Sequence, residues 1–186
     1  MKVVFVDVDT QRDFMNEDGA LYVPGAEDIK ENLGKLTSFA QKKGIPILAT
    51  VDSHSEDDAE FKEFPKHCVK GTDGQKKIDE TTFEDNENNV VFDKKTYNIY
   101  DTELGNENFL LELGNHNPDR VIIYGVALEI CVAAAAQGLL ELSIPITLVS
   151  DAVKGIDKDA CNETIAEIAK AGDDVKTTAE ILNELQ

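Results

Sequence analysis

The chain has few basic residues, few cysteines and no long hydrophobic run. Its 186 residues include 18 Lys and Arg against 37 Asp and Glu, which gives a formal net charge of −19. This excess of negative charge repels nucleic acid phosphates and anionic membrane surfaces, so we expect neither as a partner. No stretch approaches the roughly 18 consecutive apolar residues of a membrane-spanning helix.

The three cysteines are an odd number and are spread along the chain. They indicate free thiols in a reducing compartment rather than a disulfide framework. The first residues, Met1 to Phe5, run directly into a strand pattern without the layout of a signal peptide. We therefore expect a cytoplasmic protein. With no repeat, linker or low-complexity segment, residues 1–186 are expected to form a single domain.

Short apolar runs that are typical of buried strands alternate with helical patterns. The expected strands are 3–8, 46–51, 89–92, 121–124 and 144–149, with a last short one at 175–177. The expected helices are 29–43, 109–113, 132–142, 159–171 and one that begins at Ala179. This alternation predicts an α/β fold, a doubly wound, mostly parallel six-stranded sheet with helices on both faces. Functional groups gather at the carboxyl ends of the strands in such sheets.

Cys131 lies where a strand pattern gives way to a helical one. A thiol in the first turn of a helix lies in the positive field of the helix N-terminus, which predicts a lowered thiol pKa and a reactive thiolate. Backbone N–H groups of the same turn are placed to hold the oxyanion of a tetrahedral intermediate. Cys68 and Cys161 are expected to be packing residues.

Charged residues follow the ends of two other expected strands. Residues 9–13 crowd polar side chains after the first strand, and an Asp in a low-dielectric pocket there would have a raised pKa suited to taking a proton from Cys131. A Lys after the third strand, in the run Asp93-Lys94-Lys95, would lower the thiol pKa and orient the carboxylate. From the residues alone, capping by Asp and a solvated Lys remain alternatives.

Two of the three histidines fall within residues 52–67, a segment that begins with Asp52. Asp52 and His54 lie on the same side of an extended segment, and His67 can return by way of the loop. With Glu60 they form a two-His, two-carboxylate set suited to Zn²⁺, Mn²⁺ or Fe²⁺. Ordinary surface histidines in an acidic loop are the alternative. His116 is expected to cap a helix or lie on the surface.

With these motifs, the chain resembles the isochorismatase-like cysteine hydrolases, and within them the nicotinamidase branch. Residues 9–14 match the Asp-x-Gln-x-Asp-Phe signature, and residues 125–132 match the nucleophile segment. Residues 150–155 resemble the later strand-to-loop segment. Residues 52–54 and 64–72 resemble the metal and pocket loop of nicotinamidases, which the isochorismatase branch generally lacks.

The resemblance implies a role for individual residues. The implied triad is Asp9, Lys94 and Cys131, and the implied oxyanion hole is formed by the backbone N–H groups of Ala127 and Cys131, with a cis peptide between Val126 and Ala127. The implied metal ligands are Asp52, His54, His67 and Glu60, with Asp57, Asp58 and Glu63 open in place of Glu60. The implied substrate-binding residues are Phe14, Phe64 and Tyr97, whose aromatic side chains would hold a flat pyridine ring.

Two departures from the family pattern lie near the expected pocket. Residues 95–101 keep aromatic residues but lack the Ser/Gly-rich ending common after the catalytic lysine. Lys66 stands where the family usually has a second proline before the histidine. Both departures affect the choice of substrate more than the chemistry.

The implied activity is hydrolysis of nicotinamide to nicotinate and ammonia through a thioester acyl-enzyme, a step of NAD salvage. The implied cofactor is a divalent metal, Zn²⁺ first and Mn²⁺ or Fe²⁺ as alternatives, which binds the pyridine nitrogen. Other possible functions are a related amidase that cleaves a carbamoyl or ureido amide, isochorismate hydrolysis, and a non-catalytic metal-binding scaffold. Relatives often form dimers or tetramers, so a homo-oligomer is also expected.

Overall fold

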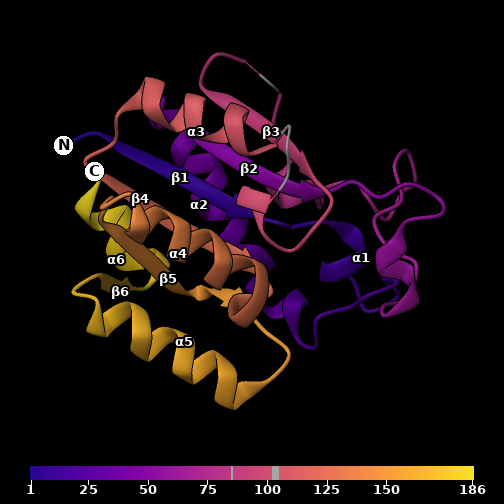
Figure 1. The fold of residues 1–186 in the computed structure, drawn as a ribbon. Coiled ribbons are helices and arrows are strands. Elements are labelled where there is room, and N and C mark those ends of the chain that lie inside the picture. Colours follow the sequence, from indigo (N-terminus) through magenta and orange to yellow (C-terminus); the bar gives the residue numbers. More distant parts are fainter. Residues whose placement is uncertain (85, 102–104) are drawn as a thin grey trace.

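The computed structural model describes residues 1–84, 86–101 and 105–186, and its centre is a six-stranded sheet (Figure 1). The strand order is β3-β2-β1-β4-β5-β6, and every neighbouring pair is parallel. The strands are β1 (Val3–Val8), β2 (Ile47–Asp52), β3 (Asn89–Lys94), β4 (Arg120–Val126), β5 (Ile146–Lys154) and β6 (Asp174–Lys176). The predicted α/β class and six strands are confirmed, and the sheet is entirely parallel rather than mostly so.

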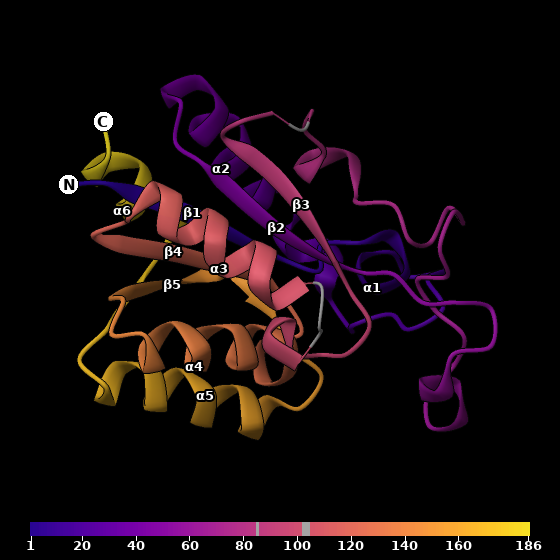
Figure 2. The same cartoon turned by 45° about the horizontal axis from the view of Figure 1, so that its top comes forward.

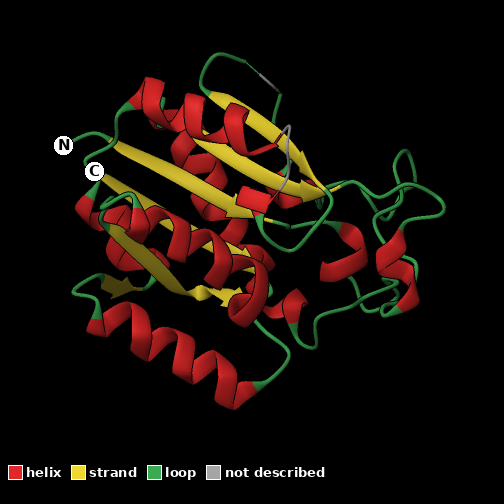
Figure 3. Cartoon of the chain, in the orientation of Figure 1, coloured by secondary structure: helices red, strands yellow, loops and turns green. Residues whose placement is uncertain are grey.

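Helices cover both faces of this sheet (Figures 2 and 3). They are α1 (Arg12–Met15), α2 (Lys30–Lys43), α3 (Gly105–His116), α4 (Ala133–Glu141), α5 (Lys158–Lys170) and α6 (Thr178–Glu184). Helices α3, α4 and α5 lie on one face, and α2 and α6 lie on the other. None of the helices in the described part of the chain has the length and apolar character needed to cross a membrane.

Local sequence explains where several helices begin and end. Gly44 ends α2 in the left-handed conformation, with φ of 66°, as its position after the periodic run predicts. Asp157 caps α5 by accepting the backbone N–H groups of Asp159 and Ala160. Thr177 and Glu180 form a capping box at the start of α6. The four-residue helix α1 was not expected, because it is too short to show a helical period.

The sheet reverses its winding at β1, which lies between β2 and β4. All six residues of β1 and of β2, and all seven of β4, are buried, which is why most of their residues are apolar. Gly125 lets β4 approach β1 closely, because a Cβ at this position would lie 2.0 Å from the carbonyl oxygen of Val8. The carboxyl ends of these strands therefore meet at the crevice where ligands bind in open α/β sheets.

Candidate functional site

Side chains from four parts of the chain meet at the carboxyl ends of the strands. Asp9 follows β1, Asp52 ends β2 and Lys94 ends β3. Parallel pairing of β2 with β3 places Asp52 opposite Lys94 in register. Cys131 comes from the π-helical turn Leu128–Val132 that follows β4 and leads into α4. These positions bring together the three residues of the implied triad.

Lys94 is the centre of a buried polar cluster and is only 2% exposed, so it is not a solvated surface lysine. Its Nζ lies 2.8 Å from Asp9 Oδ2 and 4.0 Å from Cys131 Sγ, and it forms an ion pair with Asp52. The other oxygen of Asp9 accepts a 2.7 Å hydrogen bond from the Thr50 hydroxyl. Asp9 itself is fully buried and has a left-handed backbone, with φ of 51°.

Burial changes the proton affinity of each member of this cluster. It raises the pKa of the Asp9 carboxyl above its usual range, although the Lys94 ammonium opposes the shift. Burial also disfavours the charged form of Lys94, but the carboxylates of Asp52 and Asp9 raise the pKa of Lys94 well above its usual range. The lysine is therefore a fixed positive charge, and Asp9 has the raised pKa that was predicted for an Asp at this place.

The prediction of a lowered thiol pKa at Cys131 is wrong. Burial raises the pKa of the Cys131 thiol well above its usual range, and the nearby carboxylates of Asp9 and Asp52 add to that effect. The positive charge of Lys94 opposes it without reversing it. Cys131 is therefore a neutral thiol in the resting site, and any reaction at its sulfur needs a base to accept the proton.

Asp52, His54 and His67 form a second cluster beside the first. Each offers one ligand atom, and these atoms all lie within 4.8 Å of one another. Nε2 of His54 is 3.9 Å from Asp52 Oδ2, and Nε2 of His67 is 3.8 Å from the same oxygen. His67 Nδ1 lies 2.8 Å from the carbonyl oxygen of Pro65, so an N–H there donates to Pro65 and leaves Nε2 free to bind a metal.

The two nitrogens of His54 support a metal fit at this cluster. Both are buried and neither makes a hydrogen bond within the described part of the chain. Glu60 Oε2 lies 3.8 Å from His54 Nε2, on the same side as Asp52, whereas Asp58 Oδ2 lies 3.2 Å from Nδ1 on the other side of the ring. Asp57 and Glu63 are exposed to solvent. Glu60 and Asp58 thus form a second possible ligand group around His54. The Asp52, His54 and His67 cluster is a donor set suited to a divalent metal ion.

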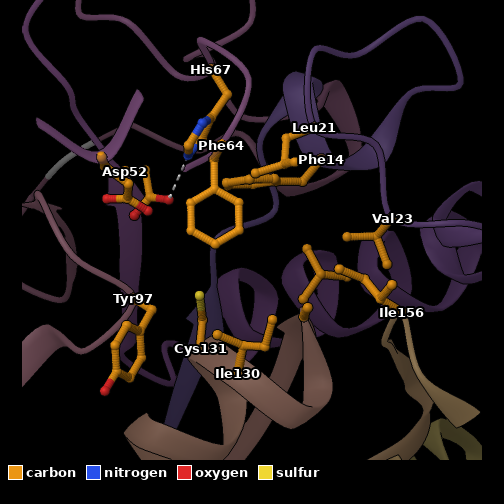
Figure 4. Close-up of a pocket in the computed structure, with 13 residues that line it drawn as sticks. Phe14, Leu21, Val23, Asp52, Phe64, His67, Tyr97, Ile130, Cys131 and Ile156 are labelled. Carbon is orange, nitrogen blue, oxygen red and sulfur yellow. Dashed lines mark ion pairs between the residues drawn. The ribbon is translucent and has the colours of Figure 1, made fainter. Parts of the chain in front are cut away.

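A cavity of about 120 Å³ opens above Cys131 (Figure 4). The expected aromatic residues Phe14, Phe64 and Tyr97 all line it, as does Ala127. The peptide bond between Val126 and Ala127 is cis, as the resemblance implied. Further lining residues that sequence reasoning missed are aliphatic: Leu21, Val23, Val126, Ile130 and Ile156. These residues come from separate loops, a strand end and a helical turn, so no periodic signal marks them as a set.

Two polar residues of the 9–14 motif hold backbone segments of the site in place through hydrogen bonds. Gln11 Oε1 accepts the backbone N–H of Asp52 at 2.7 Å, and its Nε2 donates to the Asp52 carbonyl at 2.8 Å. Asp13 Oδ2 accepts the backbone N–H of Cys68 at 2.7 Å. Gln11 thus fixes the end of β2, and Asp13 fixes the loop beside His67. The crowding of polar residues after β1 indicated a functional site. It did not show which backbone groups Gln11 and Asp13 would bind.

The chain is similar to known hydrolases along nearly its whole length. The family model described as the Isochorismatase domain matches residues 3–180. The nicotinamidase of Saccharomyces cerevisiae is 27% identical over an alignment of 198 positions, gaps included, that covers 86% of this chain and 90% of that protein. The structure of the pyrazinamidase of Pyrococcus horikoshii in complex with zinc is 30% identical, with a TM-score of 0.81 and coverage of 95% of this chain and 99% of that one. The N-carbamoylsarcosine amidase from Thermoplasma acidophilum is 29% identical, with a TM-score of 0.80 and coverage of 96% and 97%.

Proposed function

The chain belongs to the isochorismatase family, and on that premise we propose that it is a metal-containing cysteine amidohydrolase that converts nicotinamide to nicotinate and ammonia. One observation carries the proposal. Cys131 lines an aromatic-walled cavity, and the buried Lys94 lies beside both Cys131 and Asp9. Asp52 and His67 of the His/carboxylate cluster line the same cavity. The similarity to a yeast nicotinamidase and to a zinc-containing pyrazinamidase supports the same assignment.

Acyl transfer to Cys131 is the first half of the proposed reaction. Sγ attacks the carboxamide carbon while Asp9 takes the thiol proton, as the raised pKa of the thiol requires. The backbone N–H groups of Ala127 and Cys131 stabilise the oxyanion. The C–N bond then breaks as Asp9 returns the proton to the leaving nitrogen, so that ammonia departs and a thioester remains.

Hydrolysis of the thioester is the second half. Asp9 accepts one proton from water as the water oxygen attacks the thioester carbon. The C–S bond then breaks to release the carboxylic acid, which loses its own proton to solvent and becomes the carboxylate product. The proton on Asp9 returns to the sulfur and restores the neutral thiol. Throughout, the Lys94 ammonium, 2.8 Å from Asp9 and 4.0 Å from Sγ, stabilises whichever of the two groups is negative.

Asp52, His54, His67 and Glu60 are the residues that would hold the metal, which we propose is Zn²⁺, with Mn²⁺ or Fe²⁺ as alternatives. When bound, such an ion supplies a Lewis-acidic position for the ring nitrogen of the substrate and so orients the ring. The pairing of His67 Nδ1 with the Pro65 carbonyl favours the tautomer whose Nε2 can bind the ion.

The cavity favours a small, flat and uncharged substrate. Its volume of about 120 Å³ is of the order of the engineered cavity of about 150 Å³ that binds benzene, so a single six-membered ring is the right size. Among the lining residues that the structure describes there is no Lys or Arg, whereas Asp52 and Glu60 are present. No described lining side chain therefore offers a cationic partner to a substrate carboxylate.

A carbamoyl amidase is the second candidate, because the N-carbamoylsarcosine amidase of T. acidophilum is 29% identical to this chain. N-carbamoylsarcosine carries a carboxylate, for which the described cavity lining offers no cationic partner. A neutral aromatic amide therefore fits better.

The deciding experiment is ammonia release from nicotinamide, pyrazinamide and N-carbamoylsarcosine by the metal-loaded protein, with metal analysis of the same sample. Cys131→Ala is the control for contaminating activity. We expect turnover of the two aromatic amides and little of the carbamoyl compound. The opposite order would replace the first proposal by the second, and no turnover of any amide would favour the non-catalytic scaffold.

The biological setting remains a prediction. A cytoplasmic location, a role in NAD salvage and assembly into a homo-oligomer are all expectations from the sequence and the family. The proposed substrate is a small molecule, and the strong negative charge of the chain argues against nucleic acid or an anionic membrane surface as a partner.

A further inference from the structure

Glu129 joins the turn that carries the nucleophile to the loop between β5 and α5. Its Oε1 accepts the backbone N–H groups of Ile156 and Asp157, each at 2.8 Å. Its Oε2 lies 3.5 Å from Sγ of Cys161, whose thiol donates to it. Three donors, two from the loop and one from α5, therefore converge on one carboxylate that stands two positions before Cys131.

Gly155 makes this contact a tight one. A Cβ at Gly155 would lie 2.1 Å from Glu129 Oε2 and 2.3 Å from Cys161 Sγ. No side chain fits between the loop and the carboxylate, so the backbone of residues 155–157 lies directly against Glu129. The hydrogen bonds from the Ile156 and Asp157 N–H groups depend on this close approach, because a side chain at residue 155 would push the loop away from the Glu129 carboxylate.

Ile156 is the part of this loop that reaches the cavity. It lines the cavity together with Ile130, the residue after Glu129, and Figure 4 shows Ile130 beside Cys131 and Ile156 beside Val23. The side chain of Ile156 is nevertheless 56% exposed, so packing does little to hold it in place. Its position depends on the backbone at residue 156, which Glu129 binds.

We propose that Glu129 is a positioning residue that sets the aliphatic wall of the substrate cavity. By binding the 155–157 loop it holds Ile156 against the space for the substrate ring and so controls affinity for a flat substrate. This inference rests on the proposed function. It gives Glu129 no contact with the reacting atoms, since its two oxygens accept from the loop and from Cys161.

The test compares steady-state kinetics on nicotinamide for the wild type, Glu129→Ala, Glu129→Gln and Ile156→Ala. We expect Glu129→Ala and Ile156→Ala each to raise KM by about tenfold, with kcat within about twofold, because only uniform binding of the ring is lost. Glu129→Gln keeps an oxygen for the two N–H groups and should restore most of the affinity. Glu167→Gln, at an exposed position on α5, is the matched control and should leave KM unchanged.

The double variant Glu129→Ala/Ile156→Ala makes the test sharper. If Glu129 acts through Ile156, the double variant should be no worse than either single variant, because the second change removes nothing further. Effects on KM that multiply would overturn the proposal, as would an unchanged KM in both single variants of an active enzyme. If the wild type hydrolyses no amide, the proposed function fails and this role fails with it.

Alkylation of Cys161 gives a readout that does not depend on activity. Burial, reinforced by the Glu129 carboxylate, raises the pKa of Cys161 to about 11. Removing Glu129 frees the loop and the thiol, so iodoacetamide should label Cys161 faster in Glu129→Ala than in the wild type or Glu167→Gln, as mapped by mass spectrometry. Equal labelling rates would show that Glu129 does not hold this contact in solution.

Discussion

The Lys94 ammonium and the Asp52 carboxylate form a buried ion pair at register-matched ends of β3 and β2. Lys94 also lies 2.8 Å from Asp9, so one positive charge serves the proposed triad and a proposed metal ligand together. Removal of the Lys94 charge should therefore affect both the proposed triad and the proposed metal site.

Lys94→Met should therefore damage both folding and activity. The substitution leaves Asp9 and Asp52 buried without their counter-charge, and breaking a buried pair of this kind costs about 3–5 kcal/mol of unfolding free energy. Urea denaturation measures that loss. Ammonia release from nicotinamide should fall by at least about 100-fold, the lower end of the effect expected when a group that stabilises developing charge is removed.

Lys95→Met is the matched control, since Lys95 is adjacent in sequence but exposed. It should leave stability and turnover close to those of the wild type. Equal losses of stability and of ammonia release in the two variants would contradict the role assigned to the Lys94 charge.

Cys131→Ala should abolish amide hydrolysis. Removal of a nucleophile in a comparable covalent mechanism lowers kcat by up to about 10⁶-fold, and we expect a loss of at least about 10⁴-fold here. Stopped samples of the wild type analysed by intact mass should also carry an acyl adduct that the variant lacks. Cys161→Ser keeps a donor for Glu129 and should remain active. Substantial hydrolysis by Cys131→Ala would exclude the thioester mechanism.

The pH profile of kcat/KM should have an acid limb set by Asp9. Asp9 must be ionised to accept the thiol proton, so activity is lost as pH falls through the pKa of Asp9, which burial places above its usual range. The Thr50 hydroxyl stabilises the ionised form through its 2.7 Å hydrogen bond and lowers that pKa. Thr50→Val should therefore raise the pKa further and move the acid limb to higher pH.

Thr147→Val is the control for this shift, because Thr147 is also a fully buried strand threonine but lies in β5. Its acid limb should coincide with that of the wild type. A limb that stays in place in Thr50→Val would assign the titration to a group other than Asp9.

His54→Ala should weaken metal binding. Loss of an outer-sphere partner alone costs about 10–100-fold in metal affinity, and a direct ligand should cost at least as much. Competition with a chelator and elemental analysis measure the affinity and the occupancy. His116→Ala is the control, since His116 ends α3 and pairs with Glu112 at 3.3 Å. Equal metal content in the two variants would contradict the assigned ligand set.

Metal removal provides a further expectation for the same ligands. Dialysis of the wild type against a chelator should reduce nicotinamide hydrolysis, and addition of Zn²⁺, Mn²⁺ or Fe²⁺ should restore it. Full activity of the metal-free protein would remove the proposed means of orienting the ring.

Much of the fold was predictable because β1, β2 and β4 are buried on both faces and contain long apolar runs. Because apolar runs mark the strands, the sequence also showed that Asp9 and Lys94 lie at strand ends. The carboxyl ends of parallel strands meet at one edge of the sheet, so the two residues were expected to lie close together. The boundaries were less accurate. The helix expected at 132–142 is preceded by a π-helical turn from Leu128 to Val132, whose irregular hydrogen bonding leaves no periodic trace in the sequence.

The electrostatics of the site was not predictable from local sequence. The position of Cys131 in a first helical turn suggested a thiolate, but the thiol pKa is set by burial and by Asp9 and Asp52, which come from other strands. Likewise, only the folded chain brings Ile156 to the cavity and Glu129 to its backbone. When the role of a residue depends on partners that are distant in sequence, the residues next to it in the sequence do not reveal that role.

The close approach of Gly125 to the carbonyl oxygen of Val8 also bears on how such a protein can evolve. A side chain at residue 125 would push β4 from β1 and separate Cys131 from Asp9, whatever amide the enzyme accepts. The walls of the cavity, by contrast, include Phe64, Tyr97 and Ile156, which lie in exposed connections where substitutions disturb little else. Selection for a new substrate can therefore act on the connections, while position 125 allows almost no variation.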